Sequence, residues 1–222
     1  MSSSPLNRCF LTGCDAKTEW MLEWFVKNYK AHTGTPLVFA DFGVSDSMRA
    51  TLPLLGFENI IVVEKQQSKG WFYKPAAIQQ ATQYYDEVFW IDTDIHVQGD
   101  MSPVFDYLED NKLCMCEDRG WSARRGEKWH NSGLVGVRGN PKILQEWVAN
   151  CRSAKQVGDQ EVLHEMVRGS PMQRLMAISD CPTKYNYLRL DLLDGRGGEI
   201  VGMHWTGFKG NLQIEKLIYN ET

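Results

Sequence analysis

One stretch decides the fold of this chain: Val88-Phe89-Trp90-Ile91-Asp92-Thr93-Asp94-Ile95-His96-Val97. Four apolar residues followed by charge predict a strand that is buried on both faces of a sheet. Residues i and i+2 of an extended chain point to the same side, so the carboxylates of Asp92 and Asp94 can converge on one target. Converging carboxylates repel each other unless a cation lies between them. The pattern predicts a site for a hard divalent cation with open positions for phosphate oxygens. The plainer interpretation is a strand end with two solvated acids.

The chain before this stretch alternates predicted strands and helices. A glycine turn at Gly13 ends the first strand at the edge where α/β sheets bind ligands. The predicted strands are 8–14, 36–40 and 59–64. The first predicted helix is capped by Asp15 or Thr18 and ends near Ala31, and the next two are 45–56 and 74–84. This βαβ order predicts one α/β domain over residues 1–222, with a mainly parallel central sheet flanked by helices.

The chain after the stretch continues in the same style but is less regular. A short helix (103–110) and a strand (113–117) precede a polar loop (118–129) that could cover a site. A strand (130–137) and two helices (141–154 and one starting near 158) follow. The final predicted elements are an irregular region (181–198), a strand (200–203) and a short terminal helix.

Composition limits the classes of partner. The chain has 222 residues, a net charge of -4 and no basic stripe, which disfavours nucleic acid as the principal partner. No run of eighteen apolar residues and no secretory signal is present, so we expect no integral membrane segment and a cytoplasmic location. The six cysteines lack the paired spacing of a zinc site, and we expect them to be reduced and mostly buried.

The order of the polar motifs resembles the GT-A glycosyltransferases, in particular the retaining family that includes glycogenin and the lipopolysaccharide galactosyltransferases. The resemblance covers nearly the whole chain. It is carried by Lys74 before the Asp92-x-Asp94 motif, Asn131-Ser132-Gly133, Asp159-Gln160, and His204-x-x-Gly207-x-Lys209. The family pattern continues with Pro-Trp, where this chain has Gly210-Asn211.

The resemblance implies a metal-dependent GT-A (Rossmann-like) enzyme that moves a hexose from a nucleotide-diphosphate sugar, UDP-sugar first, to a carbohydrate or glycan acceptor. Mn²⁺ or Mg²⁺ would be held by Asp92, Asp94 and His204, and the diphosphate would be neutralised by Lys209. Asp159 and Gln160 would act on the donor sugar and near the reacting carbon. The implied donor-binding residues are Thr12, Asp15, Lys74, Asp92, Thr93, Asn131, Ser132, Gly133 and Gly207. Taken alone, Asp159 could instead be a helix cap or dipole partner.

Other classes fit less well. A sugar nucleotidyltransferase needs a glycine-rich basic loop after the first strand, and residues 11–17 do not form one. A haloacid dehalogenase phosphatase needs Thr or Val two residues after the second Asp, where this chain has His96. A lectin-like module that lost its metal would not need Asp92, Asp94 and His204.

The stereochemical outcome rests on which residue, if any, acts as a base. By resemblance, Asp159 binds donor hydroxyls and Gln160 cannot take a proton. The pattern therefore predicts retention of the donor's anomeric configuration. An inverting enzyme that uses Glu117 or Asp118 as its base is the alternative.

Overall fold

A computed structural model describes residues 7–63 and 70–221 of the chain. In this part of the chain, the main sheet has seven strands in the order β3-β2-β1-β4-β7-β6-β8. Strands β3, β2, β1 and β4 run parallel to one another, whereas β7 runs antiparallel to both β4 and β6. The strands are β1 (Arg8–Cys14), β2 (Leu37–Asp41), β3 (Asn59–Val62), β4 (Glu87–Ile91), β6 (Leu113–Glu117), β7 (His130–Arg138) and β8 (Ile178–Cys181). The expected mainly parallel sheet is confirmed, and Glu64, the expected end of the third strand, lies outside the described residues.

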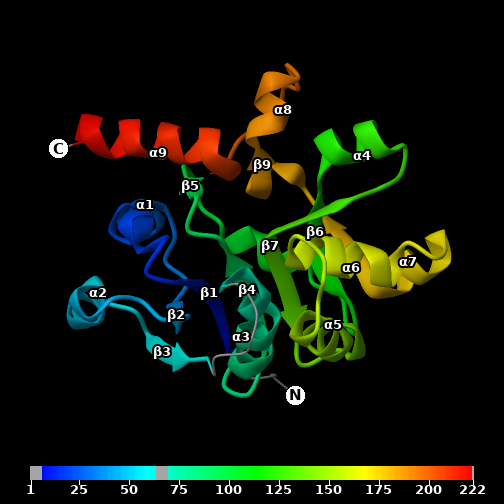
Figure 1. The fold of residues 1–222 in the computed structure, drawn as a ribbon, viewed down its shortest axis with the longest axis horizontal. Coiled ribbons are helices and arrows are strands. Elements are labelled where there is room, and N and C mark those ends of the chain that lie inside the picture. The colour runs from blue at the N-terminus through cyan, green and yellow to red at the C-terminus, as the bar shows by residue number, and fades with distance from the viewer. Residues whose placement is uncertain (1–6, 64–69, 222) are drawn as a thin grey trace, which may run out of the picture.

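Helices cover both faces of this sheet (Figure 1). Side chains of α3, α5 and α6 share one core with Val88 and Trp90 of β4, whereas side chains of α1 and α9 share the other with Phe89 and Ile91. The deciding strand is therefore buried on both faces, as its sequence predicts. The α-helices are α1 (Leu22–His32), α2 (Asp46–Thr51), α3 (Lys74–Ala81), α4 (Arg119–Arg125), α5 (Lys142–Arg152), α6 (Asp159–Val167), α7 (Pro171–Ala177), α8 (Arg189–Leu193) and α9 (Gly207–Glu221).

A second, three-stranded sheet was not predicted. Its order is β5-β10-β9, from β5 (Ile95–Val97), β10 (Gly202–His204) and β9 (Tyr187–Leu188). β10 pairs antiparallel with β5 and parallel with β9. This small sheet joins the residues just after Asp94 to the region near the C-terminal end of the sequence, and so it brings His204 back to the end of β4.

Several predicted elements need correction. The loop expected at 118–129 contains helix α4, which the carboxylate of Asp118 caps by accepting the backbone N–H of Trp121 at 2.9 Å. The region 181–198, expected to be irregular, contains the 3₁₀ helix η5 (Thr183–Asn186), β9 and α8. The segment expected to be a helix at 103–110 is the 3₁₀ helix η4 (Ser102–Tyr107), and the terminal helix is fifteen residues long instead of short.

Three 3₁₀ helices extend neighbouring elements. They are η1 (Glu19–Met21) before α1, η2 (Leu52–Leu55) after α2 and η3 (Gly70–Tyr73) before α3. The helix expected at 45–56 is thus α2 followed by η2, and its expected cap, Ser45, accepts the backbone N–H of Met48. Among the described residues, no helix combines the length and apolarity that a membrane crossing needs. The six cysteines are free and buried, as expected.

Candidate active site

A cavity of about 350 Å³ opens at the carboxyl ends of β1 and β4. Its wall includes both carboxylates of the deciding stretch and the buried Lys74. The lining residues are Gly13, Cys14, Asp15, Lys17, Thr18, Met21, Phe42, Gly70, Trp71, Lys74, Trp90, Asp92, Thr93, Asp94, Gly207 and Asn211. A pocket of this size with a few convergent charged groups is typical of a small-molecule site.

The two carboxylates converge through a turn, and this corrects the extended backbone that we predicted. β4 ends at Ile91, and the backbone N–H of Ile95 donates to the carbonyl oxygen of Asp92 at 3.1 Å. The same turn is held to β7, because the N–H of Asp92 donates to the carbonyl oxygen of Gly133 at 2.8 Å. The convergence that the sequence predicts is correct, although its geometric reason is not.

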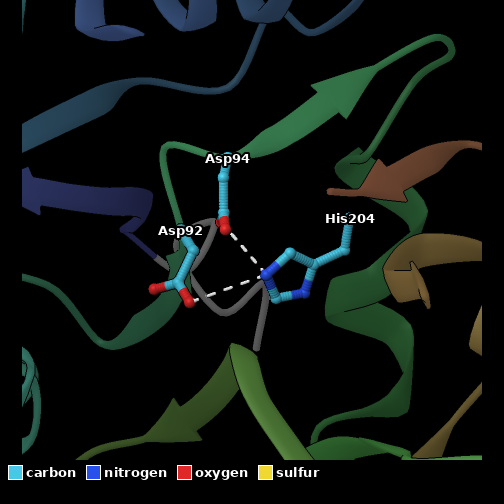
Figure 2. A group of neighbouring side chains, drawn as sticks. All are labelled: Asp92, Asp94 and His204. Atoms are coloured by element: carbon cyan, nitrogen blue, oxygen red, sulfur yellow. Dashed lines mark ion pairs between the residues drawn. The ribbon is translucent and has the colours of Figure 1, made fainter. Parts of the chain in front are cut away.

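Asp92, Asp94 and His204 form one cluster (Figure 2). The Nε2 atom of His204 lies 3.0 Å from Oδ1 of Asp94 and 4.0 Å from Oδ2 of Asp92. One ligand atom from each residue lies within 4.8 Å of the other two. Burial lowers the pKa of His204, but the Asp94 and Asp92 carboxylates outweigh it and raise that pKa above its ordinary value. The cluster favours positive charge, and its two carboxylates and one imidazole fit a divalent ion of the Mn²⁺ or Mg²⁺ kind.

Lys74 supplies a buried cation beside this cluster. Its Nζ lies 3.0 Å from Oδ1 of Asp92 and 3.5 Å from Oδ2 of Asp159, and it donates to the carbonyl oxygen of Ser132 at 2.8 Å. Burial lowers the pKa of Lys74, yet Asp159 and Asp92 raise it above its usual range, so the ammonium is charged. Burial raises the pKa of Asp159, which Lys74 opposes. Lys74 therefore connects the turn at Asp92 with helix α6.

The Asn131-Ser132-Gly133 and Asp159-Gln160 motifs also meet. Oε1 of Gln160 accepts from Nδ2 of Asn131 at 3.0 Å and from the backbone N–H of Ser132 at 3.2 Å. Nδ2 of Asn186 donates to Oδ1 of Asn131 at 2.9 Å, and Nδ1 of His204 is bonded to Oδ1 of Asn186 at 2.8 Å. Two motifs that are distant in the sequence thus form one largely buried polar group next to the Asp92, Asp94 and His204 cluster.

Gly133 cannot carry a side chain in this arrangement. A Cβ atom at this position would lie 2.2 Å from Cε1 of His204 and 2.6 Å from its Nδ1. The glycine of the Asn-Ser-Gly motif is therefore explained by the close approach of the imidazole ring.

Other predicted site residues occupy different positions. Asp15, Thr93 and Gly207 line the cavity. Thr12 is fully buried, and its hydroxyl donates to the carbonyl oxygen of Ile91 at 2.7 Å, so it joins β1 to the end of β4 behind the cavity wall. Lys209 is exposed in the first turn of α9, which begins at Gly207 beside the cavity.

The departure from the family pattern at Gly210 has a structural reason. A Cβ atom on Gly210 would lie 1.9 Å from the carbonyl oxygen of Trp205, so the start of α9 packs directly against the preceding loop. A proline ring could not occupy this position. Asn211, which stands where the pattern has Trp, lines the cavity.

Sequence reasoning missed several residues of this region, among them three aromatic or amide residues of the cavity wall and one neighbour of His204. Phe42, Trp71 and Asn211 line the cavity, and Asn186 contacts His204. Phe42 stacks on Trp90, with ring centroids 5.7 Å apart and planes 10° from parallel. Aromatic residues next to turns carry no distinctive local pattern, whereas the position of Gly70-Trp71 just before the Lys74 helix was a signal that could have been used.

The two carboxylates that we considered as bases differ in environment. Asp118 is 2% exposed, caps α4 and accepts hydrogen bonds from the side chains of Gln160 and Asn131. Burial raises the pKa of Asp118 despite these bonds. Glu117 is partly exposed at the end of β6.

Comparison with known proteins gives a family and a fold. Residues 64–206 match the family model described as nucleotide-diphospho-sugar transferase. No curated protein matches the chain by sequence. Structurally, the chain is similar to the glycosyltransferase GlyE of Streptococcus pneumoniae TIGR4, with a TM-score of 0.64 and 15% identity. The match covers 91% of this chain and 55% of GlyE, so the chain spans about half the length of that protein.

The fold is also similar to that of the galactosyltransferase LgtC, which was solved in complex with donor and acceptor sugar analogs. That match has a TM-score of 0.62 and 15% identity and covers 95% of this chain and 94% of LgtC. A structure of an active-site mutant of LgtC matches with a TM-score of 0.63 and 15% identity, covering 96% of this chain and 95% of that one. These likenesses establish the α/β fold of GT-A proteins for this chain.

Proposed function

Because the chain belongs to the nucleotide-diphospho-sugar transferase family, and is by family a glycosyltransferase, we propose that it moves a hexose from a UDP-sugar to a carbohydrate or glycan acceptor. One observation carries the proposal: the cavity at the end of β4 is lined by Asp92, Asp94 and Lys74, with His204 directly behind them. The site combines a cluster that favours a cation with a fixed positive charge. A diphosphate leaving group needs both.

The proposed cofactor is Mn²⁺ or Mg²⁺, held by Asp92, Asp94 and His204. When bound, the ion would neutralise charge that develops on the departing diphosphate. Two lysine side chains have the other electrostatic roles. Lys209, near the start of α9, adds a second positive charge for the diphosphate, and Lys74 holds Asp92 in place from behind.

The donor is proposed to lie along the cavity between the turn of Asp92 and the loop after β1. Asp15, Thr93 and Gly207 are wall residues within reach of a nucleotide, while Asp159 and Gln160 would orient the donor sugar. Asn131, Ser132 and Gly133 support this arrangement, because they fix the amide oxygen of Gln160 and admit the ring of His204.

We propose that transfer proceeds with retention of configuration. An inverting reaction needs a carboxylate that can take the acceptor's proton. Asp159 pairs with Lys74, and Asp118 is committed to the cap of α4, so neither is available as such a base. Glu117 is the base of the alternative, inverting mechanism, because no such commitment holds it.

The experiment is a panel of nucleotide sugars incubated with Mn²⁺ and with EDTA, followed by NMR of any glycoside that forms. Expected are Mn²⁺-dependent consumption of a UDP-sugar and an α-linked product from an α-linked donor. Full turnover in EDTA would contradict the metal role. A β-linked product that disappears in Glu117→Gln but persists in Asp118→Asn would establish the inverting alternative.

A further inference from the structure

The side chain behind His204 is a buried amide. Asn186 is fully buried, His204 is 3% exposed, and Oδ1 of Asn186 lies 2.8 Å from Nδ1 of His204. Asn186 is the last residue of η5, and the next residue, Tyr187, pairs with Met203 in the second sheet. The register between β9 and β10 therefore sets the amide beside the ring.

The orientation of this amide follows from its other contact. The backbone N–H of Gly133 donates to Oδ1 of Asn131 at 2.9 Å. That atom must be an oxygen, because a backbone N–H can only donate. Nδ2 of Asn186 donates to the same oxygen at 2.9 Å, so Asn186 turns its own oxygen toward His204.

The tautomer of His204 follows in turn. An amide oxygen accepts only, so Nδ1 of His204 carries a hydrogen that it donates to Asn186. Nε2 is then the ring nitrogen that faces Oδ1 of Asp94, 3.0 Å away. As an imidazolium the ring can donate to that oxygen, and as a neutral ring it offers the Nε2 lone pair to a cation held between the two aspartates.

We propose that Asn186 is a positioning residue that fixes His204 in its Nδ1–H tautomer and aims Nε2 at the cation held with Asp92 and Asp94. The assignment of the Nδ1–H tautomer stands without a metal. The statement that Nε2 faces a bound cation rests on the proposed function. The bond from Nδ1 to an amide corresponds to the outer hydrogen bond that orients metal-binding histidines in proteins. Asn131 completes the support, because it anchors Asn186 to the backbone of Gly133.

The first test needs no metal. Long-range ¹⁵N NMR of histidine-labelled, metal-free protein, recorded at a pH high enough for the ring to be neutral, reports which ring nitrogen of His204 carries the hydrogen. Expected is the Nδ1–H form in the unchanged chain, loss of that form in Asn186→Leu, and its return in Asn186→Asp, whose acid form keeps both bonds. Val148→Ala removes buried volume on α5 and serves as a control for lost stability alone. Asn186→Ser replaces the leucine variant if that variant does not fold.

The second test measures Mn²⁺ binding without nucleotide, and the EPR signal of free Mn²⁺ reports how much of the ion remains unbound. Asn186→Leu is expected to weaken binding about 10- to 100-fold, as losses of such outer bonds do. Unchanged affinity together with an unchanged tautomer in this variant would overturn the proposal. Failure of the unchanged chain to bind Mn²⁺ or Mg²⁺ would instead overturn the proposed function, and it would leave the tautomer to the NMR result.

Discussion

At the scale of single residues, Gly133 and Lys74 make the most specific demands on the sequence. Gly133 gives His204 its space, and Lys74 balances two carboxylates from different elements. Both roles are set by contacts within the chain itself.

Gly133→Ala is expected to displace the ring of His204, because the new Cβ would lie 2.2 Å from Cε1. Mn²⁺ affinity measured by calorimetry should fall at least tenfold, as expected when a ligand is misplaced. Gly34→Ala is the matched control, since nothing lies within 4 Å of a Cβ there. Equal Mn²⁺ affinity in the two variants would contradict this role.

Lys74→Met is expected to lower the free energy of unfolding by roughly 3–5 kcal/mol, the cost of leaving a buried charge unpaired. The buried partner is Asp159, so Lys74→Met combined with Asp159→Asn should recover part of the loss. Urea unfolding measures the free energy of unfolding of the single and of the double variant. Lys142→Met is the control, because its side chain is 88% exposed and its loss should cost less than about 0.5 kcal/mol. Absence of recovery in the double variant would indicate that Asp159 is not the group left unpaired.

At the scale of elements, the edge strand β8 is held by more than its pairing with β6. Asp180 of β8 accepts from Nε2 of His130 at 2.8 Å and forms an ion pair with Lys128, residues at the start of β7 and just before it. His130 and Lys128 hold the pKa of Asp180 down, at about 2.

The pH dependence of this contact has a definite sign. The folded-state pKa of Asp180 lies below its ordinary value of 3.8, so its stabilising effect is present above pH 4 and is lost as the pH falls toward 2. The unfolding temperature of Asp180→Asn should therefore lie below that of the unchanged chain at pH 5, and the difference should shrink as the pH falls to 2. Asp46→Asn removes a fully exposed carboxylate. The difference between its unfolding temperature and that of the unchanged chain should not shrink in the same way as the pH falls. A difference in unfolding temperature between Asp180→Asn and the unchanged chain that stays constant from pH 5 to pH 2 would show that the charge of Asp180 does not stabilise the fold.

The elements of the first half were predictable because each carries a local pattern. The apolar run at Val88, the cap at Ser45 and the proline after Lys74 all mark boundaries that the structure confirms. Helix α4 was missed because its stability comes from the Asp118 cap and not from apolar periodicity. The second sheet was missed because its pairs join residues far apart in the sequence, such as Met203 with His96 and with Tyr187. The candidate cluster was predicted from its residue types, but Asn186 lay in a region that we expected to be irregular.

At the scale of the whole molecule, the site joins the end of β4 to the small second sheet through His204, and to helices α3 and α6 through Lys74 and Asp159. Mn²⁺ with UDP should therefore stabilise the folded chain as one unit. At a hundred times the dissociation constant the gain is about 2.7 kcal/mol, or roughly 5–10 °C in the unfolding temperature of a domain this size. Asp94→Asn should abolish the Mn²⁺-dependent part of the shift, whereas Asp46→Asn should preserve it. An equal shift with UDP in EDTA would mean that the nucleotide binds without the ion.

The small sheet that carries His204 has a consequence for biosynthesis. The parallel strands β1, β2, β3 and β4 are synthesised first. β10, which carries His204, is synthesised only after β6, β7 and β8. Domains tend to fold from the N-terminal side during synthesis. A nascent chain can therefore assemble its first strands while Asp92 and Asp94 still lack His204, the nitrogen ligand that we propose for the cation. The proposed cation site could therefore be complete only after residue 204 has been made.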